Sequence, residues 1–195
     1  LDQVRPSLVH FHCVQRLTAS IVEVTQERAV PYLVTAHDAW WISDFQFLVD
    51  KDGKLCDLRQ NDLSVLALQS DDLGKTIARQ KYLAARLNGA AAVLAVSSAF
   101  AEIYQMNGVK KVQAVRNGVM THSWLPRSPS DSGRVRLAHI GGMSNHKGYH
   151  LFYAALENGD FENIEALVVD LSKPYGYRKT SQLGKTPVTF IGRVP

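Results

Sequence analysis

Short apolar segments alternate with longer segments of helical periodicity along the 195-residue chain. We expect helices where Leu17, Ile21 and Val24 share one face, over residues 63–88 with a break near 71–74, from Ser97 or Ser98 to 107, and over 149–157. The apolar runs predict strands at residues 8–12, 32–35, 92–96, 112–116, 135–140, 166–170 and 188–192. Strands and helices in alternation indicate an α/β fold with parallel sheets.

Residues 120–134 interrupt this alternation with two prolines and clustered serines. Such a composition is typical of a linker. We therefore expect two α/β domains, over residues 1–119 and 135–195. In the second domain, the helix over 149–157 should bury Leu151, Phe152, Ala155 and Leu156.

The composition, 46% hydrophobic and 21% charged, is that of an ordinary globular protein rather than a disordered or disulfide-rich one. Cys13 and Cys56 are expected to be reduced thiols in a cytoplasmic compartment. The apolar run over residues 90–96 is much shorter than the roughly 20 residues of a membrane-spanning helix. A net charge of +4 is too small to indicate a nucleic-acid partner.

The segment over residues 141–148 has the features of a phosphate-binding loop. Gly141 and Gly142 allow close approach of the backbone, and the following helix start favours an anion. Lys147 lies where a cation opposes the helix dipole, which an acidic ligand would explain. The alternative is a glycine turn with a solvated lysine. The loop has neither the Walker A nor the dinucleotide-binding pattern, which disfavours both of those classes.

A second group of candidates follows the strand at residues 32–35. His37 and Asp38 stand at its carboxyl end, where ligands bind in open α/β sheets, although His37 could equally complete a turn. His10 and His12 share a strand face and could hold a metal with His37 as a third ligand, but nothing fixes a fourth ligand or a second shell, so we expect no metal. Trp40 could stack on a sugar or pack beneath the loop.

Three other patterns have a simpler explanation or remain open. The Asp50-Lys51-Asp52 segment precedes Gly53 and predicts a turn rather than a metal motif. Glu157 and Glu165 are separated by a helix-breaking segment and are not expected to act together. The basic residues of the helix near Lys75 could face water or an anionic membrane. No nucleophile–base signature supports covalent catalysis.

In their order and spacing, several of these segments together resemble the family 4 glycosyltransferases, in particular members that build bacterial polysaccharides. The segments are residues 8–12, 31–38, 92–98, 115–119, 139–142 with 147–148, and 190–192. The resemblance implies the GT-B fold of two Rossmann-like domains. Residues 1–119 would be the C-terminal part of the acceptor-side domain, and residues 135–195 the start of the nucleotide-sugar-binding domain. The chain would then be an internal fragment, with both domains incomplete and no activity alone.

The resemblance also implies a retaining, metal-independent transfer of a sugar from a nucleotide diphosphate sugar to a saccharide or lipid-linked acceptor. No cofactor is expected. Lys147, with the amides of Gly141 and Gly142, would hold the donor diphosphate, and His37 would contact the donor sugar and, with Lys147, act in catalysis. The protein would be cytoplasmic, with a peripheral contact to the inner membrane face.

Further contacts to acceptor or sugar would come from His12, Asp38 and Trp40. The family usually has an arginine where this chain has Gly142. A sugar-nucleotide epimerase of the same fold and a non-catalytic sugar- or nucleotide-binding module are the alternatives.

Overall fold

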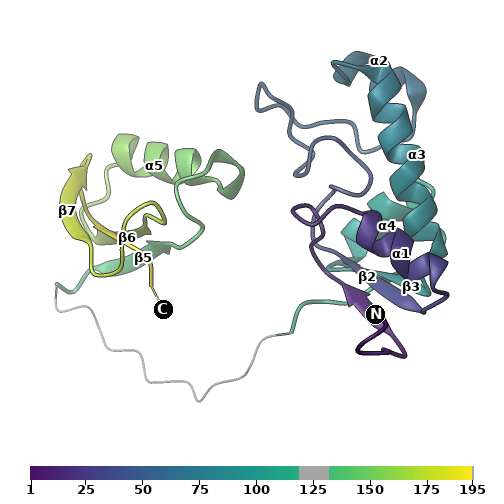
Figure 1. Cartoon of the computed structure of the whole chain (residues 1–195). Coiled ribbons are helices and arrows are strands. Elements are labelled where there is room, and N and C mark those ends of the chain that lie inside the picture. The colour runs from purple at the N-terminus through teal and green to yellow at the C-terminus, as the bar shows by residue number, and fades with distance from the viewer. Residues whose placement is uncertain (119–131, 195) are drawn as a thin grey trace. The chain divides into compact units, whose positions relative to one another are not determined.

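A computed structural model describes residues 1–118 and 132–194 of the chain. The chain divides into two compact units, Leu1–Met120 and Thr121–Pro195, which are described separately below (Figure 1). Apart from its last three residues, the linker predicted at 120–134 lies outside the described residues.

The first unit is built on four parallel strands in the order β1-β2-β3-β4. The strands are β1 (Val9–Phe11), β2 (Tyr32–Ala36), β3 (Ala92–Ala95) and β4 (Val112–Ala114). The helices are α1 (Ser20–Glu27), α2 (Leu63–Gln69), α3 (Leu73–Gly89) and α4 (Ser98–Met106). The predicted parallel α/β arrangement is confirmed for this unit.

The strand order explains why one face of this sheet is better buried than the other. Each crossover moves one strand in the same direction, and right-handed crossovers then place all connecting helices on one face. On that face Phe11, Val34 and Val93 pair in register and are at most 9% exposed. On the opposite face His10 is exposed, and Leu33, its partner in the register, is half-buried.

The predicted break in the long helix is confirmed, and it has a clear local cause. Asp72 has an extended backbone and its side chain accepts a hydrogen bond from the backbone N–H of Lys75, which starts α3 as an N-cap. Asp62 caps α2 in the same way through Ser64. Ser97, one of the two expected caps, starts α4 by accepting from Phe100.

The buried face of α1 differs from the expected one. Val22 and Thr25 are buried, whereas Leu17 and Val24 are exposed. Thr25 can be buried because its hydroxyl donates to the Ile21 carbonyl of the preceding turn. The periodicity predicted the helix correctly but placed its core face about one residue away.

The second unit contains a mixed sheet, so the expectation of a purely parallel sheet is wrong here. Its strands are β5 (Val135–His139), β6 (Ile164–Val169), β7 (Arg178–Leu183) and β8 (Thr186–Ile191), in the order β5-β6-β8-β7. β5, β6 and β8 are parallel, while β7 is antiparallel to β8. The sequence Arg-Lys-Thr-Ser-Gln of β7 has no apolar alternation, and its residues are mostly exposed, which is why it was not predicted.

The core of the second unit is small. The helix α5 (Tyr149–Asn158) follows the short 3-10 helix η1 (Asn145–Lys147). Only Leu156 of the four residues expected to be buried is fully buried, and Leu151 is 66% exposed. Leu156 packs with Ala166, Val168 and Val188. Across the described residues of both units, no helix combines the length and apolarity needed to cross a membrane.

Candidate functional site

The carboxyl ends of β1 and β2 bring the predicted histidines together. His12 and His37 follow these neighbouring strands, and their Nδ1 and Nε2 atoms are 3.0 Å apart with the rings nearly stacked. The ring of His10 lies 4.3 Å from that of His12, and its Nε2 is 2.8 Å from Thr35 Oγ1. We call His10, His12 and His37 the histidine edge.

His10 is poorly suited to holding positive charge. Burial lowers the pKa of His10, and the neighbouring His12 and His37 lower it further because a second positive charge there is repelled. In the hydrogen bond between His12 and His37, the tautomer decides which ring nitrogen donates and which accepts. Among the described residues, no group of three His, Cys, Asp or Glu is arranged to hold a metal ion.

Asp38 lies beside this edge and is engaged in the structure of the loop that follows. Its carboxylate accepts hydrogen bonds from Gln46 at 2.7 Å, from the backbone N–H of Trp40 at 2.9 Å and from Gln15 at 3.1 Å. Its carbonyl accepts from the buried Tyr104 hydroxyl. Each of these contacts fixes the start of the loop, so the visible role of Asp38 is to shape it.

Trp40 is half-buried and packed. Its ring contacts Trp41 edge-on, with centroids 5.1 Å apart, and the guanidinium of Arg79 lies 5.0 Å from its centroid. Arg79 also donates to the carbonyls of Trp40 and Ser43, and burial lowers its pKa. Arg79 is one of the basic residues of the helix near Lys75 that could have faced water or a membrane. Its contacts show that it instead packs against this loop and stabilises it.

In the second unit, the predicted phosphate loop follows β5. Gly142 and Gly148 both have φ of +74°, and Gly148 is the left-handed cap before α5. A Cβ at Gly141 would lie only 3.0 Å from Cβ of Lys147, so a glycine there allows the lysine stem to approach. We call residues 141–148 the glycine loop.

His139 holds the glycine loop in shape, a role that the sequence did not reveal. Its Nε2–H donates to the carbonyl of Gly142 at 2.8 Å, and its ring packs against Tyr149 and Phe152 of α5. A Cβ at Gly142 would lie 3.1 Å from Leu171, which follows β6. No larger side chain, including an arginine, fits at this position without movement.

Two further cations lie on the same edge of the second sheet. Arg193 follows β8, and its Nε donates to the carbonyl of Leu171 at 3.1 Å. Its backbone N–H donates to the carbonyl of Lys173, which follows β6. We call Lys147, Lys173 and Arg193 the basic edge. The sequence shows that Lys173 and Arg193 each follow a predicted strand. Only the order of the strands in the sheet shows that the two residues are neighbours.

The basic edge is rich in unused hydrogen-bond donors. Lys147 is exposed and forms no ion pair with the described residues. The nearby Asp170 accepts from the hydroxyl and backbone N–H of Ser172, and these bonds, with weaker help from Lys173, hold the pKa of its carboxyl below the usual range. Fixed cations beside a glycine turn and a helix start favour a bound anion.

The other sequence patterns have structural roles. Asp50 Oδ1 accepts from the backbone N–H groups of Asp52 and Lys54, which makes the predicted turn. Glu165 bonds Arg136 and Ser132, whereas Glu157 bonds Tyr153. Neither Cys13 nor Cys56 forms a disulfide with a described residue.

The structure thus gathers Gly141, Gly142 and Lys147 in one loop and His12, His37 and Asp38 around one sheet edge, in different units. Comparison of the sequence with models of known protein families gives no match, and comparison with curated proteins gives no significant match. The resemblance to family 4 glycosyltransferases therefore stays a prediction.

Proposed function

We propose that the chain is part of a retaining, metal-independent glycosyltransferase of the GT-B fold, with a nucleotide diphosphate sugar as donor. The basic edge is the observation that carries this proposal. Its glycine loop, helix start and cations lie at the carboxyl ends of parallel strands, where ligands of open α/β sheets bind. A diphosphate carries negative charge and acceptor oxygens, which would complement these cations and N–H donors.

The chemistry asked of the basic edge is charge stabilisation. When the bond between sugar and diphosphate breaks, negative charge grows on the leaving phosphate oxygen. The amides of Gly141 and Gly142, which the fold holds in place, would stabilise that charge together with the ammonium group of Lys147. Arg193 would supply a planar donor, since its Nε is anchored on Leu171 and its two terminal nitrogens remain for phosphate.

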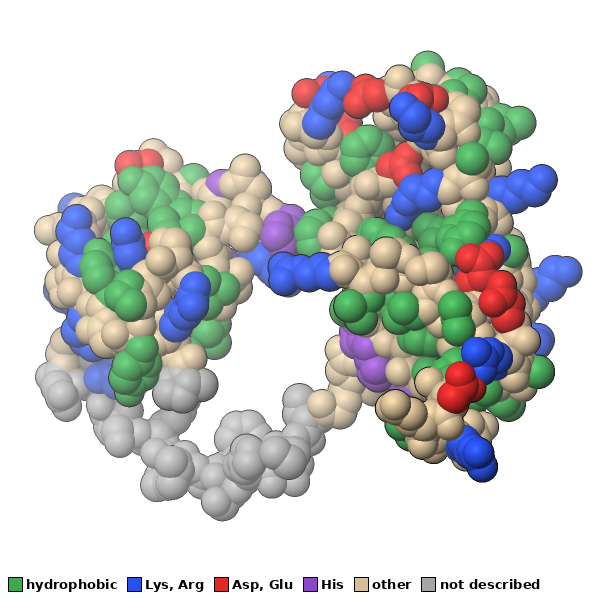
Figure 2. Space-filling view, in the orientation of Figure 1, with side chains coloured by type: hydrophobic (Ala, Val, Ile, Leu, Met, Phe, Trp, Pro, Cys, Tyr) green, Lys and Arg blue, Asp and Glu red, His purple; other side chains and the backbone are tan. Residues whose placement is uncertain are grey.

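The acceptor side of the reaction is assigned to the first unit. His37 would contact the donor sugar, with His12 as its hydrogen-bonded neighbour and Asp38 as the residue that shapes the loop. A saccharide or lipid-linked hydroxyl would be the acceptor, in a cytoplasmic setting with peripheral membrane contact. The surface over α2 and α3 mixes acidic with basic side chains (Figure 2), so that contact would not rest on charge alone.

The first test measures binding of uridine diphosphate and of inorganic pyrophosphate to the 195-residue chain by titration calorimetry. We expect Lys147→Ala to weaken binding by about tenfold to a hundredfold, the usual effect of losing a charged hydrogen bond. Lys179→Ala is the matched control, because Lys179 is an exposed lysine on β7 of the same unit. Equal affinities for the two variants would contradict the proposed diphosphate site.

Turnover is tested separately on the full-length gene product with common nucleotide sugars. Transfer to an acceptor with retained anomeric configuration supports the proposal, whereas a changed donor sugar with no acceptor product identifies an epimerase by NMR. Diphosphate binding without any turnover points to the non-catalytic module.

A further inference from the structure

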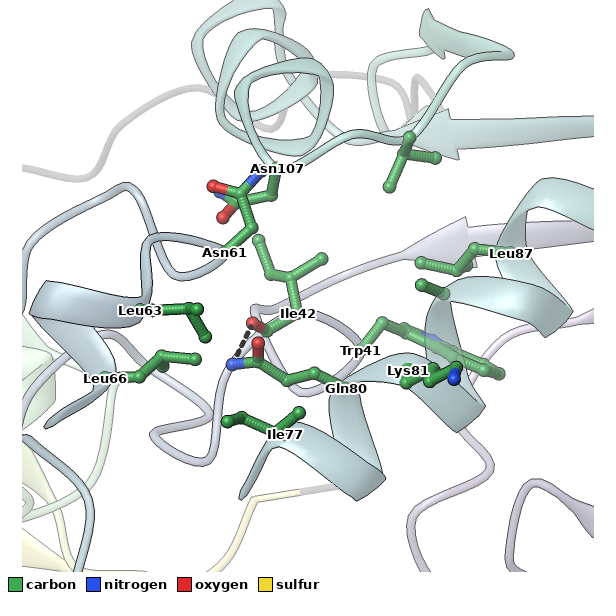
Figure 3. A pocket seen from close by; sticks show the side chains of 12 residues that line it. Trp41, Ile42, Asn61, Leu63, Leu66, Ile77, Gln80, Lys81, Leu87 and Asn107 are labelled. Carbon is green, nitrogen blue, oxygen red and sulfur yellow. Dashed lines mark hydrogen bonds between the residues drawn. The ribbon is translucent and has the colours of Figure 1, made fainter. Parts of the chain in front are cut away.

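The pocket beside α3 and the surface beside the basic edge differ in how clearly they select a ligand. The pocket, in the first unit, has a volume of about 220 Å³ and mostly apolar walls (Figure 3). Gln80 and Asn107 in its wall donate their amide N–H groups to backbone carbonyls, so shape rather than chemistry would decide its occupant. Beside the basic edge of the second unit, by contrast, cations and apolar side chains lie together.

Apolar side chains are exposed beside the basic edge, among them Leu171, Tyr175 and Val194. Tyr175 is 74% exposed, and the other two are each 52% exposed. The carbonyl of Leu171 accepts a hydrogen bond from Arg193, and Val194 is the next residue after Arg193. Apolar groups thus alternate with cations here, which suits a ligand that has both an anionic part and an apolar part.

Tyr175 lies at the corner of a tight turn. The backbone N–H of Tyr177 donates to the carbonyl of Pro174 at 3.3 Å, which closes four residues into a β-turn. Gly176, the third residue, has φ of +82°, and a glycine with positive φ at this position is typical of a type II turn. The corner position explains why so much of the tyrosine side chain is exposed. We call residues 174–177 the tyrosine turn.

The end of β8 holds the tyrosine turn in place. The backbone N–H of Gly192 donates to the carbonyl of Tyr177 at 2.9 Å. Beside it, the backbone N–H of Arg193 donates to the carbonyl of Lys173 at 3.3 Å. A Cβ at Gly192 would lie 1.8 Å from the carbonyl oxygen of Pro174, so only a glycine allows this close packing. A ligand that contacts a turn fixed in this way does not have to order it, which favours affinity.

The strand order sets the distance between the glycine loop and the tyrosine turn. The loop follows β5, the turn packs on the end of β8, and β6 lies between these strands. Neighbouring strands are roughly 4.8 Å apart, so the two features are separated by about 10 Å along the same edge of the sheet. An extended nucleoside diphosphate can bridge a separation of this size, with its phosphates at the loop and its base at the turn.

We propose that the ring of Tyr175 stacks on the base of the nucleotide whose diphosphate binds at the basic edge. The diphosphate part of this contact rests on the function proposed above, whereas the tyrosine turn adds the contact to the base. Every base has an aromatic face, so a stacked tyrosine raises the affinity for nucleotides without choosing one base. Uridine diphosphate and adenosine diphosphate should therefore both depend on Tyr175.

The test compares uridine diphosphate, adenosine diphosphate and inorganic pyrophosphate as ligands of the 195-residue chain by titration calorimetry. We expect Tyr175→Ala to weaken binding of both nucleotides by about tenfold, the effect of losing a stacked aromatic ring, and to leave pyrophosphate binding unchanged. Tyr175→Phe keeps the ring and should keep the affinity. Val135→Ala is the matched control, because Val135 is an exposed apolar residue at the start of β5, at the opposite edge of the sheet.

The three ligands separate the base contact from the diphosphate site. Nucleotide affinities that are unchanged in Tyr175→Ala, while Lys147→Ala weakens pyrophosphate binding, would overturn the stacking and leave the diphosphate site intact. An equal loss of nucleotide and pyrophosphate binding in Tyr175→Ala would also overturn it, since the basic edge itself would then be disturbed. Nucleotide binding that depends on Tyr175 in a protein that does not bind pyrophosphate would support the base contact and contradict the diphosphate site. Thermal unfolding should be the same for Tyr175→Ala and the unaltered chain, because the side chain is mostly exposed.

Discussion

The carboxyl edges of the two sheets differ in how their polar groups are used. In the first unit, His12 and His37 hydrogen-bond each other, and the Asp38 carboxylate accepts from Trp40 and Gln46 of its own loop and from Gln15. In the second unit, Lys147 has no ion-pair partner among the described residues, and within the same residues the guanidinium of Arg193 donates only through Nε. Similar strand ends can therefore form an edge whose polar groups hydrogen-bond within the protein, or an edge whose donors remain available to a ligand.

The largest effect is expected from removing the carboxylate of Asp38, beside the histidine edge of the first unit. Asp38→Ala should lower the free energy of unfolding of the first unit by about 2–3 kcal/mol, because donors from Gln15, Gln46 and Trp40 lose a charged acceptor. Urea unfolding followed by tryptophan fluorescence measures this loss. Asp52→Ala is the control, since the Asp52 side chain is exposed in the turn. Similar stabilities of the two variants would show that the edge does not depend on Asp38.

A smaller effect is expected at the glycine loop. Gly142→Ala and Gly148→Ala place alanine at the same φ of +74°, which costs roughly 1–2 kcal/mol in the left-handed region. A Cβ at Gly142 would also lie 3.1 Å from the Leu171 side chain, whereas a Cβ at Gly148 meets nothing within 4 Å. Gly142→Ala should therefore destabilise the second unit more, as measured by hydrogen exchange of its amides. Equal destabilisation by the two variants would mean that Leu171 moves aside without cost.

The smallest effect concerns pH and the histidine edge. Because the pKa of His10 is lowered on folding, the unfolded chain binds more protons as the pH falls below about 6.5. The associated stability is present above that pH and is lost as the pH falls toward the lowered pKa. His10→Gln should reduce the fall in melting temperature between pH 8 and pH 5. An unchanged pH dependence would show that neither burial nor the neighbouring histidines lower the pKa of His10 on folding.

Much of the fold could be predicted because its signals are local. The strands other than β7, the break near Asp72 between α2 and α3, and the turn at Gly53 each depend on a few neighbouring residues. The core faces of α1 and α5 were less predictable, since a short helix with apolar residues on several sides is oriented by what packs against it. Thr25 is buried because of how α1 packs in the unit, which the residue type alone does not indicate.

The candidate site was predictable only in part for the same reason. The glycine loop is continuous in sequence, so its glycines and lysine could be recognised together. Arg193 reaches this loop through Leu171, a contact that exists only because β6 lies between β5 and β8. The bond from His139 to Gly142 is local, but a histidine at the end of a strand does not by itself indicate its acceptor.

The order β5-β6-β8-β7 also constrains how the second unit assembles. After β6 the chain forms β7, which lies at the edge of the sheet, and then β8, which lies between β6 and β7. β7 and β8 are joined by a turn at Gly184 and pair over their whole length. Contacts this close in sequence form quickly, so the two strands can form a hairpin before docking on β6. Docking of that hairpin would then be the step that brings Arg193 to the glycine loop, and anion binding would report when folding of this unit is complete.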